Sequence, residues 1–575
     1  MKQSKMKNRL LLLSFVVSSM LLCGCTDGDY KISSVDAKLG IGNGNLTLPS
    51  NSSVVVTLDD ILKLGDTDVI SIDANGDYHF GKNPESLNDV RVQVDRITSS
   101  GSSSTLSFPG ISLPTSIQAL AGQTVKPSDY GISLAQNGDI SLMDYQFTVP
   151  TEVEKLNYLV LGNGTPLKIE VSLAGVTNLS KLEITLPQQL VVTNLNGGTF
   201  DSSTNKLALT NWPVSGGKVV LNFLVTRINT TLNANHTVTL NSKVHMSVDI
   251  AELTVPSASS LSVSGVVTMD NLTITAANGR FNPTIDVQEV GSTVINSLPD
   301  FLTDARVVAD IDNPQVWLTL ESNFPLGGYV EAKLSSTTAS ADVVLDKAHG
   351  NELPVVANGT TRLVVCRKAP EGLSGYTAVI APDLSNLVKK LQEGMKLSFG
   401  ITKYEADRNS DVTVDLGRDY ILKPGYNFTA PLALGDQAEI VYSSTESNWN
   451  KDLKKLEMTK NASLFVTASV NNGVPADLEI NVKPIDVNGA ELSALTVKPI
   501  LHTVAAGETS GTVKYEIVDP NGVGLKNLDG IQYELLVTSP SAASGQKGKK
   551  LNSLQKIIIK TTDLHLQGSV IYDAN

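Results

Sequence analysis

Apolar and polar residues alternate with a period of two along most of this chain. Clear examples are residues 90–94, 168–173 and 181–186, and valine, isoleucine, threonine and serine fill such runs throughout. Alternation places the apolar side chains on one face of an extended strand, and turn residues separate the runs at short intervals. We therefore predict an all-β protein of tandem β-sandwich modules, immunoglobulin-like or similar, with a few short helices.

Departures from this alternation predict the helices and one hairpin. Apolar residues at helical spacing favour helices over 383–393 and 447–458. Thr57 and Asp60 have the spacing of a capping box, which would open a short helix running to residue 64. Asn75-Gly76 separates two short strand-like runs and predicts a hairpin with a type I′ turn.

Three short segments resemble one another and indicate repeated modules. Asn163-Gly164, Asn323 and Asn472-Gly473 each follow an alternating run and precede a proline within three residues. Asparagine tolerates the left-handed conformation and proline fixes φ, so the pattern predicts a strand that ends, turns and restarts as a facing strand. A second similar pair is 145–150 and 426–431, and a looser third pair is 419–425 and 563–568. The alternative is that the asparagine and proline simply recur as β-turn chemistry.

These similarities set the predicted domain boundaries. We expect a signal peptide over 1–24, a tether and N-terminal β domain over 25–144, and β-sandwich modules over 145–280, 281–425 and 426–575. A chain of 575 residues is too long for one hydrophobic core, so several domains are required.

The N-terminal residues predict export from the cytoplasm and attachment to a membrane. Four basic residues precede an apolar stretch over 10–22, which is too short to span a bilayer and is typical of a secretory signal. Leu22-Cys23-Gly24-Cys25 follows, and this motif resembles the lipobox of bacterial lipoproteins. The resemblance implies that Cys25 becomes the first mature residue and carries acyl chains such as palmitate. Two or more chains hold a protein stably at a membrane.

The residues after Cys25 bear on where that anchor lies. Asp27 and Asp29 resemble the export signal of surface lipoproteins in Bacteroidetes-type bacteria, the alternative being an ordinary polar tether. The resemblance implies a lipid-anchored protein of the outer membrane. It leaves open whether the protein faces the cell surface or the periplasm.

The charge balance and the motif search exclude several classes of function. With 58 acidic and 45 basic residues the net charge is −13, which opposes nucleic-acid binding. The sequence matches no catalytic motif, so we predict a protein without catalytic residues. Cys366 lies in a strand-like run and is predicted to be a buried small hydrophobe. The weak candidates for a Ca²⁺ site are Asp310 and Asp312, although a strand-entry turn explains them better, and no other cofactor is predicted.

Glycan binding would need aromatic rings that stack on sugars. Trp212, beside Asn211 and Pro213, and Trp449, on a predicted helix, are the candidate ligand platforms. Trp317 lies in an alternating run with apolar neighbours, so we predict that it belongs to the core.

The leading functional hypothesis is a non-enzymatic, lipid-anchored cell-envelope protein with a structural, adhesive or binding role and a protein or glycan partner. One alternative is a carrier or chaperone of lipid or another apolar ligand, which a mean hydropathy of +0.02 favours. The other is a surface lipoprotein that captures glycans.

Overall fold

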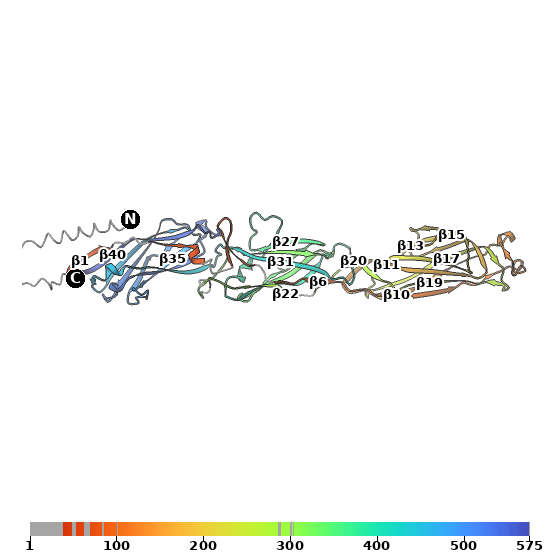
Figure 1. The fold of residues 1–575 in the computed structure, drawn as a ribbon, viewed down its shortest axis with the longest axis horizontal. Helices are drawn as coiled ribbons and strands as arrows, with labels where there is room; N and C mark the ends of the chain where they lie inside the picture. Colours follow the sequence, from red (N-terminus) through yellow and green to blue (C-terminus); the bar gives the residue numbers. More distant parts are fainter. Residues whose placement is uncertain are drawn as a thin grey trace, which may run out of the picture.

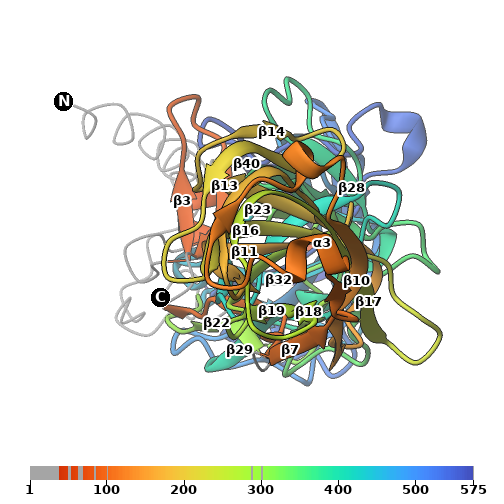
Figure 2. The same cartoon turned by 90° about the vertical axis from the view of Figure 1, so that its right-hand side faces the viewer.

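Strands dominate this protein, and its helices are single short turns. The computed structural model describes residues 38–48, 53–62, 69–82, 86–99, 102–285, 289–299, 302 and 304–573. The all-β prediction is confirmed. Three β modules follow one another along the long axis, and the chain runs out to the right-hand end and back (Figure 1). Figure 2 looks along that axis from the right-hand end.

The proximal module, residues 38–62 and 432–573, lies at the left of Figure 1. One sheet has the order β1-β40-β34-β38-β36, with β2 and β33 also paired to β40, and the other has the order β32-β39-β35-β37. The bounds are β1 Lys38–Thr47, β2 Ser53–Thr57, β32 Glu439–Glu446, β33 Leu456–Met458, β34 Ala462–Asn472, β35 Asp477–Ile485, β36 Thr496–Leu501, β37 Thr503–Val504, β38 Gly511–Asp519, β39 Gly530–Thr538 and β40 Lys556–Asp573.

The middle module comprises residues 69–99 and 284–431. One sheet has the order β21-β6-β31-β23-β27-β28, extended by β3 and β4, and the other has the order β25-β24-β29-β22-β5, with β26 on β24. The bounds are β3 Ile70–Ile72, β4 Tyr78–Lys82, β5 Ser86–Leu87, β6 Val90–Gln93, β21 Thr284–Ile285, β22 Glu289–Ile295, β23 Gln315–Ser322, β24 Gly328–Ser336, β25 Val343–Leu345, β26 Leu353–Val355, β27 Gly359–Cys366, β28 Thr377–Ile380, β29 Met395–Ala406 and β31 Tyr420–Pro431.

The distal module, residues 102–281, forms the right-hand end of Figure 1. Its sheets have the orders β13-β16-β11-β19-β7, with β20 on β11, and β10-β17-β12-β15-β14, with β9 on β17; β8 and β18 form a separate pair. The bounds are β7 Ser102–Ser107, β8 Ile111–Ser112, β9 Thr124–Val125, β10 Ala135–Thr148, β11 Val153–Leu173, β12 Val176–Thr185, β13 Leu190–Asn194, β14 Thr199–Asp201, β15 Lys206–Pro213, β16 Lys218–Asn229, β17 Thr237–Thr254, β18 Ser260–Leu261, β19 Val263–Met269 and β20 Ile274–Phe281.

The three modules share one strand order. The middle module is inserted into the proximal module, and the distal module is inserted into the middle module. The central strands β34, β23 and β11 each lie between a later strand (β38, β27, β16) and a second later strand (β40, β31, β19). The last of these pairs with an early edge strand, which is β1, β6 or β7 respectively. In the proximal and middle modules, the next module is inserted immediately after that early edge segment.

The nested modules do not follow the predicted domain boundaries. The strands of 25–144 do not form a sheet of their own, because β1 and β2 belong to the proximal module, β3 to β6 to the middle module and β7, β9 and β10 to the distal module. The predicted modules 281–425 and 426–575 likewise lack their first strands. The physical reason is that β40 pairs with a strand more than 500 residues earlier, as in Lys38 opposite Asp573.

The repeated asparagine segments have different structural roles. Asn323 lies between β23 and β24, and Asn472 ends β34 before β35, so each marks a crossover from one sheet to the other, as predicted. Asn472 is fully buried, and its Nδ2 donates to the carbonyls of Ala476 and Ala505. Asn163-Gly164 instead lies inside β11, where the register with β16 shifts. The corresponding crossover of the distal module is the turn between β11 and β12.

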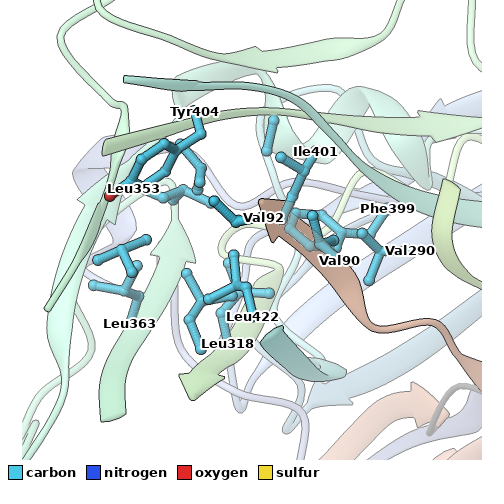
Figure 3. Close-up of a cluster of buried hydrophobic side chains, with 14 of the residues drawn as sticks. Val90, Val92, Val290, Leu318, Leu353, Leu363, Phe399, Ile401, Tyr404 and Leu422 are labelled. Carbon is cyan, nitrogen blue, oxygen red and sulfur yellow. The ribbon is translucent and has the colours of Figure 1, made fainter. Parts of the chain in front are cut away.

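A continuous apolar core lies between the paired sheets. In the middle module, Leu318, Leu363 and Leu422 of one sheet face Phe399 and Ile401 of the other (Figure 3). All five are almost completely buried. The apolar residues of the period-two pattern thus lie in the core, as predicted, because each strand contributes every second side chain to it.

The short helices and the hairpin lie where the sequence predicts them, but the helices are shorter than predicted. α2 (Leu58–Leu62) begins at the predicted capping box, in which the Thr57 amide donates to Asp60 and the Asp60 amide donates to Thr57. The stretch 383–393 forms only a 3₁₀ helix over Pro382–Leu387, and 447–458 only α4 (Asn450–Leu453). The hairpin joins β3 to β4, with Gly76 alone of the Asn-Gly pair at positive φ, so its turn is not type I′.

A polar cluster fixes the joint between the middle and distal modules. β20 pairs with both β11 and β30 (Val412–Asp415), which carries one sheet across the joint. The Asp411 carboxylate accepts hydrogen bonds from Lys155 Nζ at 2.5 Å, Asn157 Nδ2 at 2.9 Å and Arg280 Nε at 3.2 Å. The Lys155 and Asn157 side chains foremost hold the pKa of Asp411 at about 2.

Candidate functional site

The predicted lipid anchor lies outside the described residues. Cys25 precedes Lys38, the first residue of β1, by 13 positions. β1 and β40 pair with each other in the proximal module, at the left of Figure 1. The structure therefore fixes which end of the molecule the anchored segment enters, while the anchor itself stays a prediction. Among the described residues, no helix has the length and apolar character needed to cross a membrane.

Trp449 is a core residue, so the structure contradicts its prediction as a ligand platform. Its side chain is buried, and its Nε1 donates to Glu446 Oε1 at 3.1 Å. The same carboxylate accepts from Tyr533 Oη at 2.9 Å and from Thr561 Oγ1 at 3.1 Å. Burial is the main reason that the pKa of Tyr533 lies above its usual range. This buried network ties β32, β39 and β40 together instead of binding a ligand.

Trp212 is half-buried near the end of β15 and packs on the apolar core. The ring lies close to Gly197, where an added Cβ would come within 3.1 Å of the indole Cη2. Its neighbour Asn211 has φ +50. Within the part of the chain that the structure describes, no second aromatic ring contacts Trp212.

Asp310 and Asp312 lie at the joint between the middle and proximal modules, where each contacts protein groups. Asp310 Oδ2 accepts from the Gln437 amide at 2.9 Å, and Lys368 Nζ lies 3.1 and 3.3 Å from the two Asp312 oxygens. Within the described part of the chain, no three His, Cys, Asp or Glu side chains come together as a metal-binding group. The contacts indicate a structural role at the joint.

Cys366 is fully buried at the end of β27. Burial raises the pKa of its thiol, which disfavours the reactive thiolate. Its sulfur has only weak contacts, with the carbonyls of Val364 at 3.7 Å and Val379 at 4.0 Å. This placement agrees with the prediction of a small buried hydrophobe.

The structure contradicts the prediction that Trp317 belongs to the core. It was expected in the core, but it is half-exposed, on the opposite face of β23 from the buried Leu318 and Leu320. Its ring and that of Tyr376 meet edge to face, with centroids 4.8 Å apart. The sequence contained the signal, because Trp317 is in phase with Thr319 and Glu321 and out of phase with the leucines.

An open hollow of about 460 Å³ lies over these two rings. Besides Trp317 and Tyr376, its lining residues are Thr319, Gly425, Tyr426, Asn427 and Thr429. All seven are uncharged, in a protein with a net charge of −13. Convergent polar groups around an aromatic surface are typical of small-molecule sites.

A second open hollow, of about 390 Å³, is polar and is lined by residues that include Glu321, Asn323 and Lys423, whereas two other cavities are small and apolar. One, of about 50 Å³, lies at the joint between the proximal and middle modules and is lined by residues that include Phe80, Leu391 and Leu551. The other, of about 20 Å³, lies in the middle module beside Val316 and Phe428. Pockets that hold drug-sized ligands usually measure about 300–1,000 Å³, so neither accommodates a lipid chain.

Several segments at the far end of the distal module contain no charged side chain, although exposed Lys126, Asp129 and Lys218 lie directly beside them in the sequence. These uncharged segments are residues 108–124, with α3 (Thr115–Gln118), and the turns at 174–175, 214–217 and 255–260. Backbone hydrogen bonds hold these segments together, as from Gly122 to Val255 and from Leu173 to Gly217. Figure 2 shows α3 and β18 facing the viewer at this end.

Comparison with known proteins identifies no family. No family model and no curated protein matches the chain. Among solved structures, a predicted secreted protein from Parabacteroides distasonis is similar, with a TM-score of 0.35, 16% identity, and coverage of 52% of this chain and 90% of the other. A chain of Sulfolobus turreted icosahedral virus has a TM-score of 0.12, 11% identity, and coverage of 80% and 98%. Both scores are too low to support a functional argument.

Proposed function

We propose that this protein is a non-enzymatic, lipid-anchored component of the cell envelope that holds its distal module away from the membrane. The observation that supports this most directly is the path of the chain. β1 and β40 lie side by side in the proximal module, and the chain reaches the opposite end of the molecule before it returns (Figure 1). An anchor at Cys25 would therefore tether one end and present the other.

The nested connections suit a stiff spacer. Because each inner module is inserted into its neighbour, the chain crosses both joints twice, and strand pairing and ion pairs reinforce them. β11 alone has 21 residues, which extend roughly 70 Å at about 3.3 Å per residue. A single flexible linker would not hold the distal module at a set height.

The chemistry of the far end suits contact with an uncharged partner. The whole chain has a net charge of −13, whereas the segments 108–124, 174–175, 214–217 and 255–260 contain no charged side chain. A neutral partner that contacts these segments desolvates no fixed charge on them. An adhesive or binding role fits this better than an apolar-ligand carrier, since the two apolar cavities are small.

The anchor can be tested with the two cysteines of the motif. We expect Cys25→Ser to move the protein from the membrane to the soluble fraction, whereas the control Cys23→Ser stays in the membrane. Fractionation followed by immunoblotting measures this. A Cys25→Ser protein that still sediments with outer membranes would overturn the anchor.

Exposure is tested separately with epitopes inserted after Gly216, at the far end, and after Gly489, in the proximal module. We expect antibody to reach the Gly216 epitope on intact cells at least as well as the Gly489 epitope. Staining of the Gly489 epitope alone would contradict outward display of the distal module. If both epitopes are stained only after lysis, the protein faces the periplasm and outward display is excluded.

A further inference from the structure

The outer face of the β23 sheet carries an aromatic surface that the core does not use. Leu318 points into the core (Figure 3), so Trp317 and Thr319 on either side of it point to the opposite face. On the adjacent strand β31, Asn427 lies opposite Trp317 and Gly425 opposite Thr319. Because Gly425 has no side chain, the face stays open next to the indole.

The two rings are held in fixed positions. Trp317 Nε1 donates to Gln315 Oε1 at 3.1 Å, and Gln315 is 6% exposed. The planes of Trp317 and Tyr376 meet at 82°, so one ring can form a floor and the other a wall. A hydrogen-bonded indole that packs against a second ring loses little freedom when a ligand binds, which favours affinity.

The lining indicates the chemistry of the ligand. The side chains of Thr319, Asn427 and Thr429 offer hydroxyl and amide groups beside the rings. Charged side chains border the lining residues: exposed Arg362 lies directly opposite Thr319 on β27, and Glu321 lies opposite Lys423. An aromatic floor with neutral hydrogen-bonding groups matches a sugar ring, which has an apolar C–H face and a rim of hydroxyls.

We propose that this hollow binds a neutral pyranose unit of a polysaccharide, with the sugar face on Trp317 or Tyr376 and its hydroxyls on Thr319 and Asn427. The hollow is open, so a chain can enter from the side without a free end. The site lies in the middle module and does not depend on the lipid anchor or on the uncharged segments at the end of the distal module. The proposal therefore goes beyond the display function and can fail independently of it.

The test uses the purified mature chain in affinity electrophoresis with soluble neutral glucan, mannan and xylan, with anionic polygalacturonate and a proline-rich peptide as comparators. We expect at least one neutral polysaccharide to retard the protein. Trp317→Ala and Tyr376→Ala should each weaken that retardation about tenfold or more, because each removes one aromatic contact. The matched control is Tyr329→Ala, an exposed tyrosine on the other sheet of the same module, which should change nothing.

Trp317→Phe separates loss of binding from loss of folding, because it keeps a ring at the site and should retain part of the retardation. Circular dichroism and thermal unfolding of each variant check the fold. The proposal is overturned if no neutral polysaccharide retards the protein, or if folded Trp317→Ala binds as tightly as the original chain. Binding restricted to polygalacturonate or to the proline-rich peptide would also overturn it.

Discussion

At the residue scale, three tryptophans of one sequence have three different environments. Trp449 is buried with its indole bonded to Glu446; Trp212 and Trp317 are both partly buried, but Trp212 packs on the core and Trp317 lines an open hollow. The buried Glu446 carboxyl accepts hydrogen bonds from Trp449, Tyr533 and Thr561, which lie in separate segments. Such a network stabilises only while each donor keeps its acceptor.

Glu446→Gln should destabilise the proximal module by about 2 kcal/mol, because the amide NH₂ cannot accept from the donors that the carboxylate serves. The measurement is urea denaturation followed by fluorescence of Trp449, in a background with Trp212→Phe and Trp317→Phe. The control Glu371→Gln, on the surface, should stay within about 0.5 kcal/mol. An unchanged urea midpoint for Glu446→Gln would show that the network contributes nothing.

At the element scale, β20 is decisive because it pairs with β11 on one side and β30 on the other. Asp411 directly precedes β30 and collects donors from β11 and β20. The backbone pairing and this carboxylate together join two modules that share no continuous strand. The joint therefore has a part that depends on pH and a part that does not.

The pH-dependent part follows from the lowered pKa of Asp411, which is about 2 against an ordinary value of 3.8. A lowered pKa in the folded state stabilises the joint above about pH 4, and this contribution disappears as the pH falls toward 2. Spin labels on Thr210→Cys and Ser374→Cys should give a narrow distance distribution at pH 5 that broadens near pH 2.5. Adding Asp411→Asn should broaden it already at pH 5 and remove most of the pH dependence. Identical distributions in both proteins at both pH values would contradict this.

At the scale of the whole molecule, the nesting makes the three modules unequal in their dependence on one another. The distal module is one continuous segment, whereas the middle and proximal modules are each assembled from two distant segments. β2 covers the first part of β40 and β1 the last part. Removing residues 38–57 therefore leaves a long edge strand unpaired, and such edges promote aggregation.

Fragments can test this dependence directly. A fragment of residues 98–283 should fold alone and unfold cooperatively, because it contains every strand of the two distal sheets except β30. Residues 426–575 alone should aggregate or show reduced strand content, and fusing residues 34–62 to them through a flexible linker should restore a soluble fold. Circular dichroism and size-exclusion chromatography measure both. A stable monomer of 426–575 alone would contradict the requirement for β1 and β2.

The sequence by itself determined the strand class, the β3–β4 hairpin and the capping box of α2, because these depend on neighbouring residues within a few positions, whereas its turn at Asn163-Gly164 was wrong. The similar segments 419–425 and 563–568 fall on equivalent strands, β31 and β40, but at different positions, because Leu422 pairs with the end of β23 whereas Asp563 pairs with the middle of β34. Tertiary structure alone decided which strands pair, since period-two alternation separates two faces of a strand but does not name its neighbour. For the same reason only the fold could bury Trp449 beneath other strands and leave Trp317 open to solvent: covering a face depends on segments far away in the chain.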